Sequence, residues 1–176
     1  MKLKSFFIFS LVFCILFSSI PMNKASAISY SIDFDINSKS VYLVNLDTGI
    51  SVYEKDKDKK CYPASTTKIM TYIIVTENIK DLDNTKVTVK QSILNRLNGT
   101  GSSTAGLIGG ETLTVTQLLN CLMIPSGNDA ALVLADYVGG GSITNFVKMM
   151  NKKAKERQYG DLYLYQHLCL YPRTGA

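Results

Sequence analysis

The order of hydrophobic and polar positions predicts a short hairpin followed by a largely helical region. Residues 41–46 and 50–54 have the composition of two strands, and Asp-Thr-Gly at 47–49 is typical of a turn. Together they predict a hairpin with a three-residue loop that contains a glycine. The mixed-sign charged run at 55–60 is then expected to be a solvated loop rather than a docking patch for an anionic polymer.

Helical spacing of apolar residues dominates the rest of the chain. The first helix is predicted to begin at Pro63, because proline lacks only an N–H that the first turn would leave unpaired. It is expected to end near residue 78 or 80. Apolar residues lie on nearly every side of it, which predicts a helix buried in the middle of a domain. Further helical segments are expected at residues 91–97, 115–123, 130–138 and 143–156.

Local signals mark the ends of these segments. Thr114 and Gln117 have the spacing of a capping box, and the glycines at 139–141 end the following helix. The connecting stretches are predicted as a short strand at 87–89, a small-residue loop at 98–106, and turns at 109–114 and 125–129. In the last helix, one face is apolar and the other carries lysines: Phe146, Val147, Met149 and Met150 against Lys148, Lys152, Lys153 and Lys155.

The first 27 residues predict a secretory signal peptide. Lys2 and Lys4 precede an apolar run at 6–20, and small residues follow at 25–27. This order is typical of a leader, so we expect cleavage after Ala27 and export from the cytoplasm. A membrane anchor is the alternative, but a run of about fifteen residues is shorter than the roughly twenty that span a bilayer. Membrane contact is therefore expected only through the uncleaved leader.

Composition describes an ordinary soluble domain. The 176-residue chain has a formal net charge of +5, and the leader removes three lysines and no acidic residue. About +2 remains on ~150 residues, which suits one domain and gives no case for nucleic-acid binding. Cys61, Cys121 and Cys169 lie beyond the leader. Three thiols cannot all pair and their spacing fits no metal site, so we expect buried or incidental thiols.

The candidate chemistry lies at the mouth of the first helix. Ser65 and Lys68 are three residues apart, so they share one helix face and can touch. A serine hydroxyl needs a base to become a nucleophile, and a lysine can serve when apolar surroundings lower its pKa. A Ser-x-x-Lys pair also arises by chance, so by itself it is weak.

A second cluster strengthens this interpretation. Ser126 and Asn128 form a Ser-x-Asn motif in the tight turn between two apolar helices. Alone, Asn128 or Asp129 would be taken as the cap of the following helix. Ser-x-x-Lys followed by Ser-x-Asn, however, is found in class A β-lactamases and penicillin-binding proteins.

The residues that flank both motifs resemble those of the S11 serine peptidases, the D-alanyl-D-alanine carboxypeptidases of bacterial cell walls. The similar stretches are YPASTTKIMT at 62–71, GETLTV at 110–115 and IPSGNDAA at 124–131. The resemblance implies an α+β fold of the β-lactamase/transpeptidase type, here mainly the helical lobe and the N-terminal hairpin. It assigns residues 28–156 to the N-terminal part of that domain and 157–176 to a divergent tail.

The resemblance also implies a role for each matched residue. Ser65 would attack the carbonyl between the two terminal D-alanines of a peptidoglycan stem peptide, and Lys68 would take its proton. Ser126 would relay a proton to the leaving D-alanine, and Asn128 would hold Lys68 or the substrate amide. β-Lactams, which imitate D-Ala-D-Ala, would acylate Ser65. No metal or cofactor is implied.

The resemblance weakens after residue 156. The family carries a third motif, Lys-Thr-Gly, on a strand that lines the site, and Arg173-Thr174-Gly175 is not expected to replace it because it follows Ser126 too soon. An altered reading frame near Arg157 would explain the divergence, and His167 then needs no catalytic role. Slow hydrolysis is the expectation for a chain without that strand and its oxyanion donor.

Three functions remain open at this point. The first is a serine D-Ala-D-Ala carboxypeptidase, exported and associated with the cell wall. The second is a non-catalytic, wall-associated binder of stem peptides. The third is a class A β-lactamase-like hydrolase, which the S11-like residues around the motifs disfavour.

Overall fold

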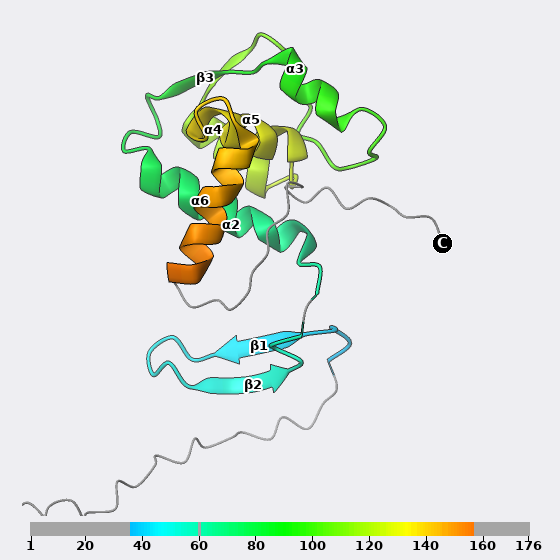
Figure 1. Ribbon diagram of the computed structural model, residues 1–176, viewed down its shortest axis with the longest axis vertical. Coiled ribbons are helices and arrows are strands. Elements are labelled where there is room, and N and C mark those ends of the chain that lie inside the picture. The colour runs from blue at the N-terminus through cyan, green and yellow to red at the C-terminus, as the bar shows by residue number, and fades with distance from the viewer. Residues whose placement is uncertain (1–35, 60, 157–176) are drawn as a thin grey trace, which may run out of the picture. The chain divides into compact units, whose positions relative to one another are not determined.

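The computed structural model describes residues 36–59 and 61–156 (Figure 1). These residues fall into two units, which divide between residues 59 and 60. The first unit holds a hairpin, and the second holds the helices and a small sheet. The predicted leader, its cleavage site, Arg173, His167 and Cys169 lie outside the described residues.

The hairpin pairs strand β1 (Val41–Val44) with strand β2 (Ser51–Lys55) in antiparallel fashion. The prediction of a hairpin is confirmed, but its loop is longer than the predicted three residues and covers 45–50. The reason is local: the Asn45 side chain accepts hydrogen bonds from the backbone N–H groups of Asp47 and Thr48, both at 3.0 Å. A turn closed by the Asn45 side chain takes in residues that were predicted to end the first strand and to begin the second.

The second unit places its elements in the predicted order. They are η1 (Ala64–Thr66), α2 (Thr67–Asn78), β3 (Lys86–Thr88), α3 (Gln91–Leu94), η2 (Asn95–Leu97), β4 (Thr112–Thr114), α4 (Val115–Met123), α5 (Asn128–Val138) and α6 (Ile143–Glu156). The capping box of Thr114 and Gln117 is present at the start of α4. The α6 boundaries agree with the prediction, and α5 starts two residues earlier than expected.

One connecting stretch was predicted incorrectly. Residues 112–114 form strand β4 rather than part of a turn, and β4 pairs antiparallel with β3. Val87 lies opposite Leu113 in this pair, and the Thr88 and Thr112 hydroxyls are 2.9 Å apart. A three-residue strand has too short a pattern to be recognised without its partner, so the pairing could not be read from the chain.

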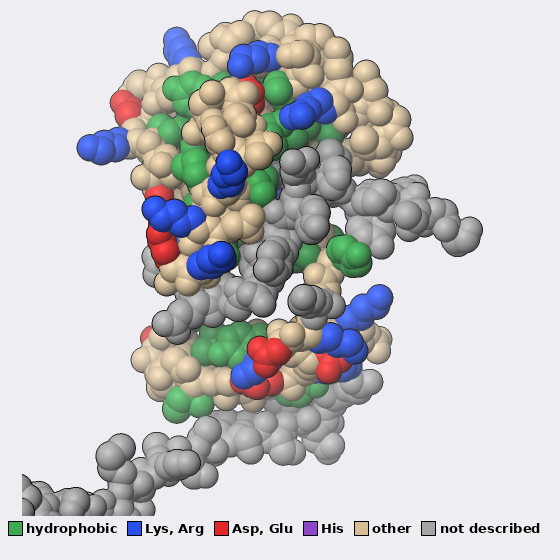
Figure 2. Space-filling view, viewed as in Figure 1, with side chains coloured by type: hydrophobic (Ala, Val, Ile, Leu, Met, Phe, Trp, Pro, Cys, Tyr) green, Lys and Arg blue, Asp and Glu red, His purple; other side chains and the backbone are tan. Residues whose placement is uncertain are grey.

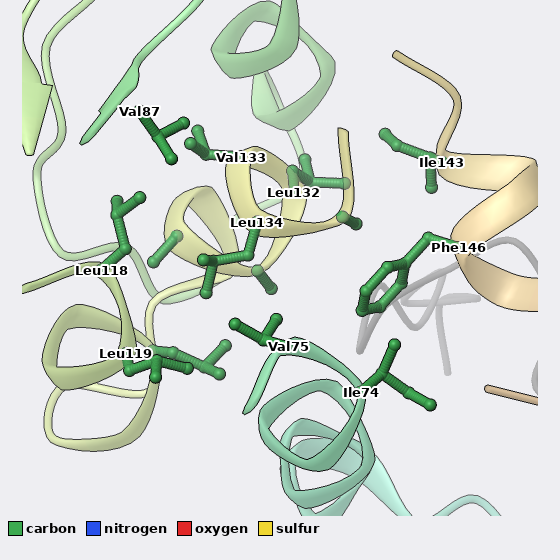
Figure 3. Packing of buried hydrophobic residues seen from close by; sticks show 14 of the residues in the cluster. Ile74, Val75, Val87, Leu118, Leu119, Leu132, Val133, Leu134, Ile143 and Phe146 are labelled. Carbon is green, nitrogen blue, oxygen red and sulfur yellow. The ribbon is translucent and has the colours of Figure 1, made fainter. Parts of the chain in front are cut away.

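Helix α5 lies at the centre of the hydrophobic core. Every residue from 128 to 136 is buried, and the other helices and β3 surround this segment (Figure 3). Phe146 of α6, Leu118 of α4 and Val75 of α2 all contribute fully buried side chains. This packing fixes the start of α5, where the candidate motif Ser126–Asn128 lies.

Helix α2 is less buried than its sequence predicts. Ile74 and Val75 face the core, but Ile69 is 54% exposed and Tyr72 is 41% exposed. The expectation of burial on every side is therefore wrong for this unit. The buried side of α2 includes the polar residue Lys68, which is 3% exposed.

Helix α6 has the two faces that its sequence predicts, with one exception. Phe146, Val147 and Met150 are buried, and lysine side chains line the side of α6 seen in Figure 2. Lys153, however, is not fully outside: its side chain is 19% exposed and pairs with Glu77 of α2 at 2.6 Å. Within residues 36–59 and 61–156, no single helix is long and apolar enough to cross a membrane; α5 and α6 pass that test only as a pair bent by 89°.

Candidate active site

Ser65 lies in the short helix η1, immediately before α2. Pro63 precedes this turn, and Ala64 has a left-handed backbone with φ of 48°. The hydroxyl of Thr66 donates a hydrogen bond to the Pro63 carbonyl at 2.6 Å. Ser65 is exposed, so its hydroxyl is accessible to a ligand. The N-terminal end of α2 also favours negative charge at this position.

Lys68 lies in the first turn of α2 and is almost completely enclosed. Its ammonium nitrogen Nζ donates hydrogen bonds to Ser126 Oγ at 3.0 Å and to Asn128 Oδ1 at 2.7 Å. Both acceptors are uncharged. These two contacts hold Nζ directly beside the Ser126 hydroxyl, where an amine and a hydroxyl can exchange a proton.

Ser126 lies in the turn between α4 and α5. Its φ of 57° is unusual for a residue other than glycine, and such backbone strain clusters at functional sites. The next residue, Gly127, donates its N–H to the Cys121 carbonyl at 3.0 Å. A Cβ at Gly127 would approach that carbonyl oxygen to 2.6 Å and Asp129 Oδ1 to 2.7 Å, so only glycine fits.

The four side chains predicted from the two motifs meet in one hydrogen-bonded chain. Ser126 Oγ donates to Ser65 Oγ at 3.0 Å, and Lys68 Nζ contacts both Ser126 and Asn128. Hydroxyl protons rotate, so the same contacts also permit Ser65 to donate toward Ser126 and Ser126 toward Lys68. The arrangement therefore offers a proton path from an exposed hydroxyl to an enclosed amine.

Asp129, which from sequence alone is only a possible helix cap, positions a loop beside the motif. Its carboxylate is 2% exposed and accepts hydrogen bonds from the backbone N–H groups of Ala105, Gly106 and Leu107 at 2.9–3.0 Å. It also accepts the N–H of Ala130 at 2.9 Å. A buried carboxylate that accepts several backbone donors fixes the loop that supplies them.

The loop that Asp129 holds is connected to the motif by two more hydrogen bonds. Ser103 Oγ donates to the Ser126 carbonyl at 2.9 Å, and the Asn128 N–H donates to the Ser103 carbonyl at 2.9 Å. Residues 103–107 and 126–129 are therefore joined by hydrogen bonds from both segments. The small-residue composition of 98–106 was the signal for this loop, but its partner could not be identified from sequence.

The two described cysteines are free thiols. The sequence predicted that each thiol is either buried or incidental. Cys61 is exposed, so it is not a buried thiol. Cys121, at the C-terminal part of α4, is partly buried, and burial raises the pKa of its thiol; the Asp129 and Glu111 carboxylates add to this rise. Neither thiol contributes to the hydrogen-bonded chain described above.

Known proteins with similar sequences share this region. The peptidase S11 family profile, described as D-alanyl-D-alanine carboxypeptidase, matches residues 24–162. The D-alanyl-D-alanine carboxypeptidase DacF of Bacillus subtilis is 40% identical over 118 residues, which is 67% of this chain and 30% of that protein. The D-alanyl-D-alanine carboxypeptidase of Streptomyces sp. strain K15 is 40% identical over 119 residues, 64% of this chain and 40% of that protein. The chain thus spans well under half of these relatives.

Solved structures agree with this assignment. A variant of the Streptomyces K15 DD-transpeptidase superposes with a TM-score of 0.69 at 35% identity, covering 74% of this chain and 52% of that one. The D-alanyl-D-alanine carboxypeptidase DacD from Francisella tularensis gives 0.70 at 28% identity, covering 86% of this chain and 35% of that one. The predicted fold class is therefore confirmed, and the chain belongs to the peptidase S11 family of D-alanyl-D-alanine carboxypeptidases.

Proposed function

We propose that this protein removes the terminal D-alanine from peptidoglycan stem peptides through an acyl-enzyme on Ser65. The observation that carries the proposal is the hydrogen-bonded chain from exposed Ser65 through Ser126 to enclosed Lys68, which Asn128 holds from the other side. Family membership supplies the class of substrate, since the family and its named relatives are D-alanyl-D-alanine carboxypeptidases.

Acylation begins at Ser65. Its Oγ bonds to the carbonyl carbon between the two D-alanines, while the Ser65 proton passes to Ser126 and the Ser126 proton passes to the neutral Lys68 amine. The contacts at 3.0 Å between Ser65 and Ser126 and between Ser126 and Lys68 support this route. The sequence predicts that Lys68 takes the Ser65 proton, and the route through Ser126 proposed here keeps Lys68 as the final acceptor.

The leaving group needs a proton at its nitrogen. As the C–N bond breaks, the protonated Lys68 returns a proton through Ser126 to the departing D-alanine amine. Asn128 Oδ1, at 2.7 Å from Nζ, holds Lys68 in line with Ser126 in both protonation states. Water then hydrolyses the ester on Ser65 and restores the serine. A general base of this kind typically contributes about 10²–10⁴ in rate.

A β-lactam would follow the same first step. Its strained amide presents a carbonyl carbon to Ser65, and ring opening leaves the acyl group attached because the leaving nitrogen remains in the adduct. We therefore include β-lactams among the ligands of the site. We further propose that the protein acts outside the cytoplasm, at the cell wall, which the sequence of residues 1–27 supports.

Transfer of the acyl group to an amine is a second candidate for the last step. The solved relative from Streptomyces K15 is described as a DD-transpeptidase. Both reactions share the Ser65 acyl-enzyme and differ only in whether water or an amine attacks it. Adding glycine or a D-amino acid to the assay, and measuring the exchanged product against D-alanine release, distinguishes the two.

The test is D-alanine release from a synthetic peptide that ends in D-Ala-D-Ala, using the full chain. We expect slow release that Ser65→Ala abolishes and that Ser92→Ala leaves unchanged, since Ser92 is an exposed residue of α3 outside the site. Equal release by the parent and Ser65→Ala proteins would contradict the proposal.

A further inference from the structure

A pocket lies in the helical unit away from Ser65. It has a volume of about 310 Å³ and is lined by strand β3, the start of α3, the last turns of α5 and the glycine loop that follows α5. Its floor is apolar: Val87 of β3 and Val133 of α5 are buried and lie next to each other (Figure 3). Tyr137, which is 44% exposed, forms part of its wall.

This pocket is separate from the candidate active site. Asn128 begins α5, whereas Tyr137 and the glycines at 140–141 lie at the other end of the helix. With a rise of 1.5 Å per residue, the two ends of α5 are about 15 Å apart. None of the residues that line the pocket belongs to the Ser65–Ser126–Lys68–Asn128 chain.

Within residues 36–59 and 61–156, β3 pairs only with β4, so its other edge has no strand partner there, and the pocket runs along that edge. Val115 donates its N–H to the Thr85 carbonyl and Val89 donates its N–H to the Glu111 carbonyl, so the backbone groups of odd-numbered residues face β4. Because these groups alternate in direction along a strand, those of Lys86 and Thr88 point away from β4. Lys86, Val87 and Thr88 all line the pocket, as expected for a pocket at the strand edge.

The side chains that line the pocket carry one net positive charge, because Lys86 and Lys90 stand against the single carboxylate of Asp136. Lys90 follows Lys86 by four residues, just beyond the end of β3, so in an extended chain the two lie on the same side, and both are exposed. Lys90 pairs with Asp136 of α5 at 2.7 Å. Within the part of the chain that the structure describes, Lys86 has no carboxylate partner, so its charge is available to a ligand.

We propose that this groove between β3 and α5 binds an extended acidic peptide. The peptide adds as a third strand to the free edge of β3, in the manner of other strand-addition sites. Alternate side chains of the peptide enter the apolar pocket over Val87 and Val133, and the intervening carboxylates pair with Lys86. The binding pattern thus repeats the alternation of β3 itself, in which Val87 is buried and Lys86 is exposed.

The probe is an N-acetylated, C-amidated hexapeptide of alternating valine and glutamate, titrated into the ¹⁵N-labelled full chain. We expect chemical-shift changes at the amides of Lys86 and Thr88 that saturate. Lys86→Glu should weaken the affinity roughly tenfold, because it replaces an attraction by a repulsion at a partly hydrated site. Lys148→Glu is the matched control, since it makes the same charge change on the exposed side of α6 and should leave binding unchanged.

Two modified probes test the mode of binding. N-methylation of alternate amides on one peptide edge should abolish binding, and methylation on the other edge should leave it intact, because only one edge meets β3. A valine–lysine hexapeptide should bind at least tenfold more weakly. Equal binding of the acidic and basic probes, or unchanged affinity in Lys86→Glu with its fold verified by circular dichroism, would overturn the proposal. So would shifts confined to the Ser65 region.

Discussion

Helices α2 and α5 supply the two halves of the candidate active site, and they are built differently. Helix α5 is buried from residue 128 to 136, so its polar residues Asn128 and Asp129 are held by core packing on every side. Helix α2 buries Lys68 but exposes Ile69 and Tyr72. The difference indicates that α5 is the fixed frame of the site. Helix α2 places Lys68 against α5 and leaves another of its sides exposed to solvent.

The largest effect is expected where the two helices meet. Lys68→Arg keeps the positive charge but cannot deprotonate, and its larger guanidinium does not reproduce the contacts to Ser126 and Asn128. Acylation of Ser65 by a penicillin should slow by about 10²–10⁴-fold, the usual contribution of a general base. Stopped-flow or gel-based acylation rates measure this, with Lys148→Arg as control. A rate within threefold of the parent, roughly 0.7 kcal/mol, would remove Lys68 from the mechanism.

The contrast in burial predicts a contrast in stability. Leu134→Ala removes a fully buried side chain of α5 and should lower the free energy of unfolding by about 2–5 kcal/mol. Ile69→Ala truncates an exposed side chain of α2 and should change it by less than about 0.5–1 kcal/mol. Urea denaturation of both variants tests the comparison. Equal losses would show that the outer side of α2 is covered in solution.

Within α5, the carboxylates at its two ends should also differ. Asp129→Ala leaves the backbone donors of residues 105–107 without their acceptor and should cost on the order of 3 kcal/mol, together with slower acylation. Asp136→Ala removes only the pair with exposed Lys90 and should cost about 1 kcal/mol or less. Asp129→Asn, which keeps one acceptor oxygen, should recover part of the loss. An Asp129→Ala protein as stable as the parent would contradict the positioning role.

The smallest expected effect concerns the thiols. Because burial raises the pKa of Cys121, its thiol stays protonated to higher pH than usual, and alkylation by iodoacetamide should be slow and accelerate as the pH rises. Exposed Cys61 should react more quickly near pH 8, by roughly fivefold. Peptide mapping of the alkylated sites separates Cys121 from Cys61 and from the other cysteines of the chain. Faster labelling of Cys121 would show that the C-terminal part of α4 opens in solution.

Much of the fold follows from local signals. The apolar spacing of α6 and the capping box at Thr114 predicted their elements at the right residues, because each signal is contained in a few neighbouring positions. Strand β4 and the long hairpin loop were missed. The first depends on a distant partner, and the second depends on which backbone donors the Asn45 side chain accepts.

The site shows the same division. The two sequence motifs identified Ser65, Lys68, Ser126 and Asn128 as site residues. Spacing along a helix, however, predicted that only Ser65 and Lys68 lie close together. The contacts across 58 to 61 residues, from Lys68 and Ser65 to the turn before α5, depend on how α2 packs against α5. Asp129 had no signal beyond its place near a helix start, because its partners are backbone groups of a distant loop.

Peptide mapping after penicillin treatment tests the central claim most directly. The full chain is incubated with benzylpenicillin, quenched, digested and analysed by mass spectrometry, beside Ser65→Ala and Ser103→Ala. Ser103 is an exposed serine of the loop that contacts Ser126, so it is the nearest alternative nucleophile. The account predicts one covalent adduct on Ser65, lost in Ser65→Ala and retained in Ser103→Ala. An adduct on another residue, an adduct that survives in Ser65→Ala, or no adduct in the parent chain would contradict it.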